Sequence, residues 1–209
     1  MTQTNPFTPQ SGLPPKIFSG RQAEIDGFAH SLDKMRDEQL EHILVLGEWG
    51  IGKTSLLRQF KKTSQDKGFW SCFCGVNRVD PKENISARLG LIVDEIILGL
   101  PVSEERIESL RRKFNFKTKS ASSVQLEFAR FLLEAWKEMR ASLSCIFLDD
   151  VQNFLPRFEV IDILRATLSR EDIMKQTRFV FILSSTFQGW DYFLNKHDPI
   201  GRFFRKKIM

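Results

Sequence analysis

The stretch Ile43–Phe60, ILVLGEWGIGKTSLLRQF, decides the fold. It opens with an apolar run that is typical of a buried strand of a parallel sheet. Residues 47–54 then match G-x-x-x-x-G-K-[ST] in full, and a helical pattern follows, which is the context that a phosphate-binding loop requires. Glycines allow the tight turn that points successive amide groups at phosphate oxygens. The sequence therefore predicts a nucleoside triphosphate site here.

The residue types in this loop predict its roles. Lys53 supplies a point charge for the β- and γ-phosphates, and the Thr54 hydroxyl is a ligand for Mg²⁺. The start of the helix adds its positive dipole end at the same place. Trp49 either packs over the nucleotide or a neighbouring subunit, or covers the base of the loop. The expected contacts are Gly47, Glu48, Trp49, Gly50, Ile51, Gly52, Lys53, Thr54 and Ser55.

Two carboxylates follow a second apolar run, CIFLDD, at residues 145–150. Asp149 fits the Walker B role, holding Mg²⁺ through a water, and Asp150 fits a general base or a water-positioning acid. The alternative is a helix cap beside a solvated charge. A phosphate-binding loop needs a group that holds magnesium, so we favour the first interpretation.

A third apolar run, RFVFILSST at residues 178–186, ends in Ser184, Ser185 and Thr186. Hydroxyls at the carboxyl end of a central strand lie beside the nucleotide in open α/β sheets. One of them is a candidate for sensing the γ-phosphate or orienting water. Ordinary turn chemistry is the other explanation.

The composition bounds the class of protein. A chain of 209 residues, 42% of them hydrophobic, can build one good-sized core. Its 19 Phe against one Tyr indicate rings used for packing. Cys72, Cys74 and Cys145 lie in apolar runs, which indicates reduced, buried thiols. With no membrane-length run and no signal peptide, we expect a soluble cytoplasmic protein.

Strand-like and helix-like stretches alternate along the chain. We expect an extended arm over residues 1–16, strands at 42–48, 69–76, 145–150 and 178–186, and helices at 22–40, 54–67, 84–99, 125–140 and 160–168. Residues 103–123 should form a short helix and a mobile loop, and a short aromatic segment follows Gly189. This alternation predicts an α/β fold with a parallel sheet covered on both faces.

The segment Ile17–Ile25, IFSGRQAEI, with NPFTP and LPPK ahead of it, resembles the beginning of AAA+-type ATPases near the origin-recognition and STAND branches. The loop, FLDD and FILSST follow in that family's order, so the resemblance spans nearly the whole chain. It implies a three-layer, mostly parallel P-loop NTPase sheet of the ASCE type. The implied strand order is 5-1-4-3-2, with the fifth strand at the extreme C-terminus, in a core domain of residues 17–209.

The resemblance also implies residue roles. Gly20 and Arg21, with Ile17, would lie near the adenine. Thr186 or Ser185 would take the sensor-1 place, where many relatives carry Asn or Arg. PIGRFFRKKI resembles the last core strand with its leading arginine, so Arg202, or less favourably Arg205, would reach a neighbour's γ-phosphate; the alternative is a basic tail. Relatives continue into a helical lid, so we expect a truncated or incomplete copy that hydrolyses ATP slowly.

Two functions fit these patterns. The first is an ATP-binding and ATP-hydrolysing module, with Mg²⁺, that acts as a conformational switch on a homo-oligomer or a partner protein. The second is a nucleotide-gated DNA-binding or assembly module of the replication-initiator type, in which hydrolysis is secondary. A net charge of +5 permits a polyanionic partner.

The segment 106–119 bears on this choice, because Phe114 and Phe116 interleave there with arginines and lysines. A solvated helix and loop is the other interpretation of that segment. Residues 195–198 spell N-K-x-D, but an aromatic stretch precedes them where a guanine-reading motif needs a strand. A small-molecule kinase would need an arginine-rich lid after the third strand, which we do not find.

Overall fold

The computed structural model describes residues 20–37, 40–76, 83–116, 121–196 and 199–209; the arm expected at residues 1–16 lies outside them. Five parallel strands form one sheet in the order β2-β3-β4-β1-β5. They are β1 (His42–Leu46), β2 (Trp70–Gly75), β3 (Ser144–Asp149), β4 (Phe179–Ser185) and β5 (Phe204–Ile208). The expected order 5-1-4-3-2, read from the other edge, is confirmed.

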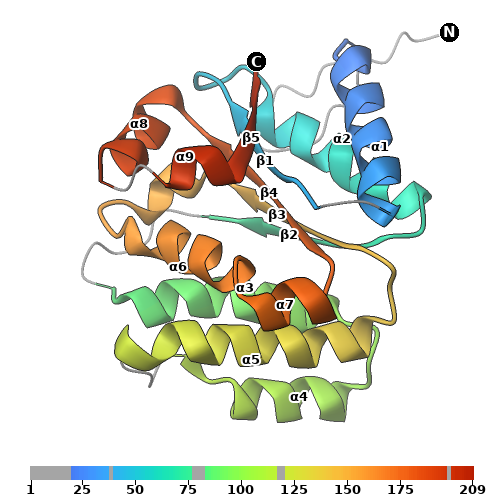
Figure 1. The fold of residues 1–209 in the computed structure, drawn as a ribbon, viewed down its shortest axis with the longest axis vertical. Helices are drawn as coiled ribbons and strands as arrows, with labels where there is room; N and C mark the ends of the chain where they lie inside the picture. Colours follow the sequence, from blue (N-terminus) through green and yellow to red (C-terminus); the bar gives the residue numbers. More distant parts are fainter. Residues whose placement is uncertain (1–19, 38–39, 77–82, 117–120, 197–198) are drawn as a thin grey trace, which may run out of the picture.

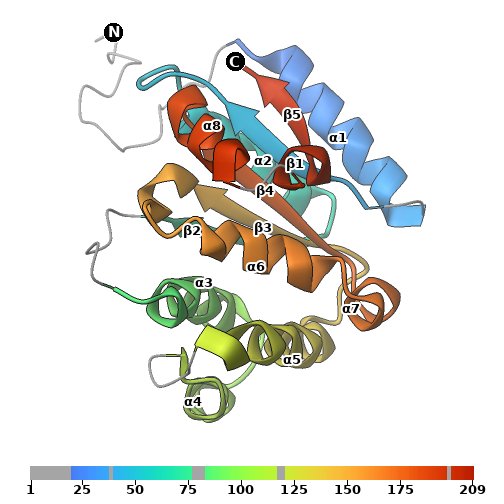
Figure 2. The same ribbon diagram turned by 60° about the vertical axis from the view of Figure 1, so that its left-hand side comes forward.

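Helices cover both faces of the sheet, which gives three layers (Figure 1, Figure 2). One face carries α1 (Gln22–Asp37) and α2 (Lys53–Asp66). The other carries α3 (Ile85–Gly99), α5 (Ala121–Met139) and α6 (Glu159–Leu168), with α4 (Glu104–Lys113) as the outermost element of this layer. The remaining elements are the 3-10 turn η2 (Val151–Phe154), α7 (Glu171–Gln176), α8 (Phe187–Lys196) and α9 (Ile200–Phe203). No helix of the described residues has the length and apolar character needed to cross a membrane.

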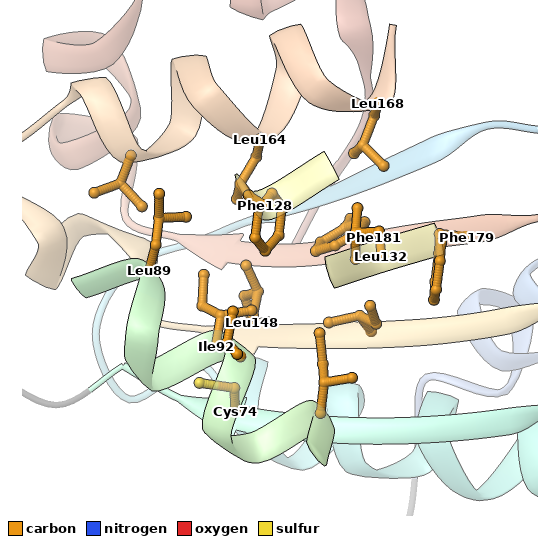
Figure 3. Packing of buried hydrophobic residues seen from close by; sticks show 14 of the residues in the cluster. Cys74, Leu89, Ile92, Phe128, Leu132, Leu148, Leu164, Leu168, Phe179 and Phe181 are labelled. Carbon is orange, nitrogen blue, oxygen red and sulfur yellow. The ribbon is translucent and has the colours of Figure 1, made fainter. Parts of the chain in front are cut away.

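The central strands β1, β3 and β4 are buried along their whole length, because helices cover them from both sides. On the α3–α5–α6 face, Phe128 and Leu132 of α5 lie against Phe181 of β4, while Leu164 comes from α6 above (Figure 3). Most phenylalanines are buried, as their excess over tyrosine predicts. The core therefore holds the strand ends in fixed positions.

The structure corrects several element boundaries. Helix α5 begins at Ala121 rather than at residue 125, and α7 was not expected. The aromatic segment after Gly189 belongs to α8, a helix that begins at Phe187. Asn195 and Lys196 end this helix, while His197 and Asp198 lie outside the described residues, so a helix rather than a strand leads into N-K-x-D.

Candidate nucleotide-binding site

The loop between β1 and α2 has the backbone that its glycines predict. Gly50 and Gly52 have φ angles of 79° and 95°, in the left-handed region that favours glycine. Gly52 precedes α2 and no side chain caps the first turn of that helix. The open amide groups of this turn, with the helix dipole, make a place suited to an anion.

Lys53 lies at the centre of the loop. Its side chain is buried, and Nζ donates hydrogen bonds to the carbonyl oxygens of Gly47 and Glu48, both at 3.0 Å. Trp49 is 67% exposed, and Lys53 Nζ lies 5.6 Å from the centre of its ring. The loop is thus folded around its own ammonium group, with an indole ring above it.

Asp149, at the end of β3, meets Thr54 of α2 and Ser184 of β4. Ser184 Oγ donates a hydrogen bond to Asp149 Oδ1, and the Thr54 hydroxyl lies near enough to this carboxylate to lower its pKa. Burial raises the pKa of Asp149, and these two hydroxyls act against that rise. A hydroxyl beside a carboxylate is a donor set of hard oxygens that suits Mg²⁺ with waters and phosphate oxygens completing its shell. Thr54 and Asp149 therefore fit the metal role predicted for them.

Asp150 adopts a left-handed backbone with φ of 58°. Its amide donates to Ser184 Oγ at 2.8 Å, and its Oδ1 accepts a hydrogen bond from Gln152 Nε2 at 3.0 Å. Asp150 is therefore held through its main-chain amide by Ser184 and through its carboxylate by Gln152, at the carboxyl ends of the strands where the loop lies. Sequence reasoning missed Gln152 altogether and did not choose Ser184 over its two neighbours.

The other two hydroxyls of this strand end have different surroundings. The Ser185 carbonyl accepts the Gly47 amide at 3.3 Å, while Ser185 Oγ is buried without a hydrogen-bond partner among the described residues. Thr186 Oγ1 accepts the amide of Gly189 at 3.1 Å, so it caps the start of α8. Gly189 packs so closely that an added Cβ would lie 2.4 Å from Gln152 Cβ.

Gly20 and Arg21 directly precede α1, and both have positive φ angles, 82° and 62°. Arg21 pairs with Glu24 at 3.1 Å. Helix α1 begins at the end of the sheet where the strands finish, the end that also carries the loop (Figure 1). Ile17 lies outside the described residues.

Arg202 and Arg205 lie at the opposite end of the sheet, where the strands begin. Arg205 pairs in register with Ile43, near the start of β1, and Arg202 precedes β5 in α9. Strand β1 has five residues, so this end lies about 16 Å from the loop. Neither arginine can reach the loop of its own chain. A finger role is open to them only toward a second molecule.

The basic segment does not present its rings to solvent. Phe114 and Phe116 are 5% and 2% exposed and belong to the core, so the rings offer no stacking surface to nucleic-acid bases, and the alternative interpretation, a helix with solvated charges, agrees better with the structure. Arg106 pairs with Glu134 and Glu138 of α5, at 2.8 and 2.6 Å. A helix with an apolar inner face and paired outer charges explains the pattern; residues 117–120 lie outside the described part.

A family profile described as "AAA ATPase domain" matches residues 17–182. These residues include the loop and both carboxylates, and the five-stranded parallel sheet agrees with that assignment. The chain belongs to the AAA ATPase domain family. No curated protein sequence matches the chain.

Several solved structures share the fold of this chain. The Aeropyrum pernix ORC2 protein, in ADPNP–ADP complexes, has a TM-score of 0.67 at 18% identity, over 96% of this chain and 50% of that one. Cdc6p from Pyrobaculum aerophilum has a TM-score of 0.61 at 20% identity, over 94% and 47%. The Aeropyrum pernix ORC1 protein in complex with DNA has 0.59 at 18%, over 93% and 46%. The chain spans about half the length of these structures.

Proposed function

We propose that this chain binds ATP with Mg²⁺ and hydrolyses it, as a nucleotide-driven conformational switch. One observation carries the proposal. At the carboxyl ends of the strands, around an open helix N-terminus, the pair Lys53 and Thr54 lies close to the pair Asp149 and Asp150, which is distant in sequence. This combination of cation, hydroxyl and paired carboxylates is what phosphoryl transfer to water requires.

Each group has a task that follows from its surroundings. The loop amides and Lys53 bind the phosphates, and Lys53 Nζ exchanges its two carbonyl partners for phosphate oxygens. Thr54 and Asp149 would hold Mg²⁺, which would neutralise charge on the phosphates. Asp150 orients a water and accepts its proton as the water oxygen attacks the γ-phosphorus, while the bond from that phosphorus to the bridging oxygen breaks and ADP leaves. Ser185, Thr186, Gly20 and Arg21 remain candidates for nucleotide contact at the same end of the strands, and Arg202 is a candidate for contacting a neighbour's nucleotide.

The second candidate, a nucleotide-gated DNA-binding or assembly module, draws no support from the described part of segment 106–119. Its phenylalanines are core residues and Arg106 is paired with acids of the same chain. We therefore expect Arg111→Gln together with Arg112→Gln to leave DNA affinity and its salt dependence unchanged. A loss of salt-dependent DNA binding in this variant would restore the second candidate. The three free, buried cysteines support a cytoplasmic location.

Two substitutions test the proposal. Lys53→Ala should weaken ATP binding at least about 100-fold, because the phosphates lose the cation buried at the centre of the loop. Asp150→Asn should keep binding within about threefold and slow hydrolysis at least about 100-fold. Binding is measured by isothermal titration calorimetry and hydrolysis by phosphate release, with Lys62→Ala on the exposed side of α2 as the matched control. Intact binding in Lys53→Ala would refute the assignment of the loop.

A further inference from the structure

A cavity of about 730 Å³ lies at the end of the sheet where the strands begin, opposite to the phosphate-binding loop. It is formed where β1, β4 and β5 begin and where α7 and α9 pack beside them. Its lining residues are Leu40, Glu41, His42, Leu168, Ile173, Met174, Thr177, Arg178, Phe179, Arg202, Phe203 and Arg205. Of the residues with a proposed role in the ATPase, only Arg202, the candidate for contacting a neighbour's nucleotide, lines this cavity.

Polar and apolar groups both line the cavity. Phe179, Ile173 and Leu168 are buried, at 1%, 2% and 5% exposure, and Phe203 stacks on the ring of His42 with centroids 4.6 Å apart. Burial lowers the pKa of His42 to about 4, so its imidazole is neutral at pH 7. The apolar surface open to a ligand comes from Leu40 and Phe203, which are partly exposed, and from Met174, which is 59% exposed.

Positive charge lies among the lining residues. Three of them are arginines and the only carboxylate is Glu41, which Arg205 already binds at 2.7 Å. Arg178 donates to the carbonyl oxygen of Met35. Arg202 is exposed and, within the part of the chain that the structure describes, its guanidinium has no hydrogen-bond or ion-pair partner. One cation is thus available to an incoming anion.

We propose that this cavity binds a small amphipathic anion, with an apolar body against Met174 and Phe203 and a carboxylate, sulfonate or phosphate group on Arg202. The volume of the cavity falls in the range of small-molecule sites. A guanidinium suits such oxyanions because it donates two parallel hydrogen bonds. The site does not depend on nucleotide binding, since the cavity and the phosphate-binding loop lie at opposite ends of the strands.

The probe for the test is 8-anilinonaphthalene-1-sulfonate, an aromatic body that carries one sulfonate. The full chain is titrated by fluorescence and by calorimetry with saturating ADP and Mg²⁺ present, so that the nucleotide site is competed. Three variants are compared with the unchanged chain: Arg202→Gln, Met174→Asp and Lys206→Gln. The last removes the same charge from an exposed position of β5 that does not line the cavity. Circular dichroism and thermal melting check that each variant folds.

We expect one saturable site. Arg202→Gln should weaken it about tenfold, because a charge-assisted hydrogen bond is lost. Met174→Asp should weaken it similarly by repulsion, and Lys206→Gln should leave it unchanged. N-phenyl-1-naphthylamine, which lacks the sulfonate, should bind at least about tenfold more weakly. Benzoate and phenyl phosphate as competitors then separate a carboxylate ligand from a phosphate ligand.

Three results would overturn the proposal. Equal affinity in all variants would place the probe elsewhere, and saturable binding that is seen only when ADP is left out would place it in the nucleotide site. Binding that tracks protein concentration and self-association would assign this face to a second copy of the chain.

Discussion

Ser184 Oγ joins the two acids of the site: it accepts the amide of Asp150 at 2.8 Å and donates to the carboxylate of Asp149. One buried hydroxyl on β4 thus fixes both the end of β3 and the direction in which the chain leaves it. The carboxylate of Asp149 and the main chain of Asp150 keep their relative positions because they share this atom.

Ser184→Ala should destabilise the chain by about 1–3 kcal/mol, because a buried amide and a buried carboxylate both lose their partner. Ser185→Ala is the matched control. The Ser185 hydroxyl has no hydrogen-bond partner among the described residues, so its removal should change stability by less than about 0.5 kcal/mol. Urea unfolding without nucleotide measures both. Equal losses would show that Ser184 does not carry this connection.

Gln152 should act as a positioning residue, because its amide nitrogen bonds the Asp150 carboxylate. Gln152→Ala should lower kcat about 3- to 10-fold and leave ATP affinity within about twofold, since the carboxylate loses one of its restraints. Steady-state hydrolysis and calorimetry separate the two effects. A faster variant would mean that Gln152 restrains Asp150 instead of positioning it.

Two glycines in helices should respond oppositely to alanine. At Gly189 the new Cβ would lie 2.4 Å from Gln152 Cβ, so Gly189→Ala should destabilise by about 1–3 kcal/mol despite the better helix propensity of alanine. At Gly27 of α1 nothing lies within 4 Å, so Gly27→Ala should stabilise by about 0.5–1 kcal/mol. Thermal melts report both. Stabilisation at both positions would contradict the close packing of α8 on η2.

His42 should make stability depend on pH. Its Nδ1 accepts the amide of Phe181 at 3.1 Å, and burial lowers its pKa from 6.5 to about 4. Between pH 4 and 6.5 the imidazole of His42 is therefore protonated in the unfolded chain but neutral in the folded chain. The contribution of His42 to the free energy of unfolding is fully present above pH 6.5 and falls by about 3 kcal/mol as the pH drops toward 4.

His42→Gln keeps an acceptor at this position but does not titrate. The difference in the free energy of unfolding between the unchanged chain and this variant should shrink between pH 6.5 and 4. Urea titrations at several pH values measure that difference. A constant difference would show that His42 is protonated equally in both states.

The phosphate-binding loop and the strand order could be predicted from the sequence, because a local motif and an alternating pattern encode them. The choice of Ser184 could not. The side chains of Ser184 and Ser185 point to opposite faces of β4, and Thr186 lies between β4 and α8. Thr186 is used by α8 as a cap, which depends on where that helix begins.

The burial of two rings in the basic segment depends on distant contacts in a similar way. Phe114 and Phe116 lie among charges in the sequence, and only their contacts with Phe131 and Phe128 of α5 show that the rings point inward. The cavity at the other end of the strands combines residues from three distant parts of the chain. No local pattern could have indicated it.

Lys53 fills the loop with its own ammonium group, held by two main-chain oxygens. The loop is therefore preorganised for a nucleotide. Binding would exchange the hydrogen-bond partners of Lys53 and would not need to order a flexible turn. We expect the entropic penalty of capture to be small for that reason. Discrimination against lone inorganic phosphate follows from the same arrangement, since a ligand must outcompete both oxygens to engage the lysine.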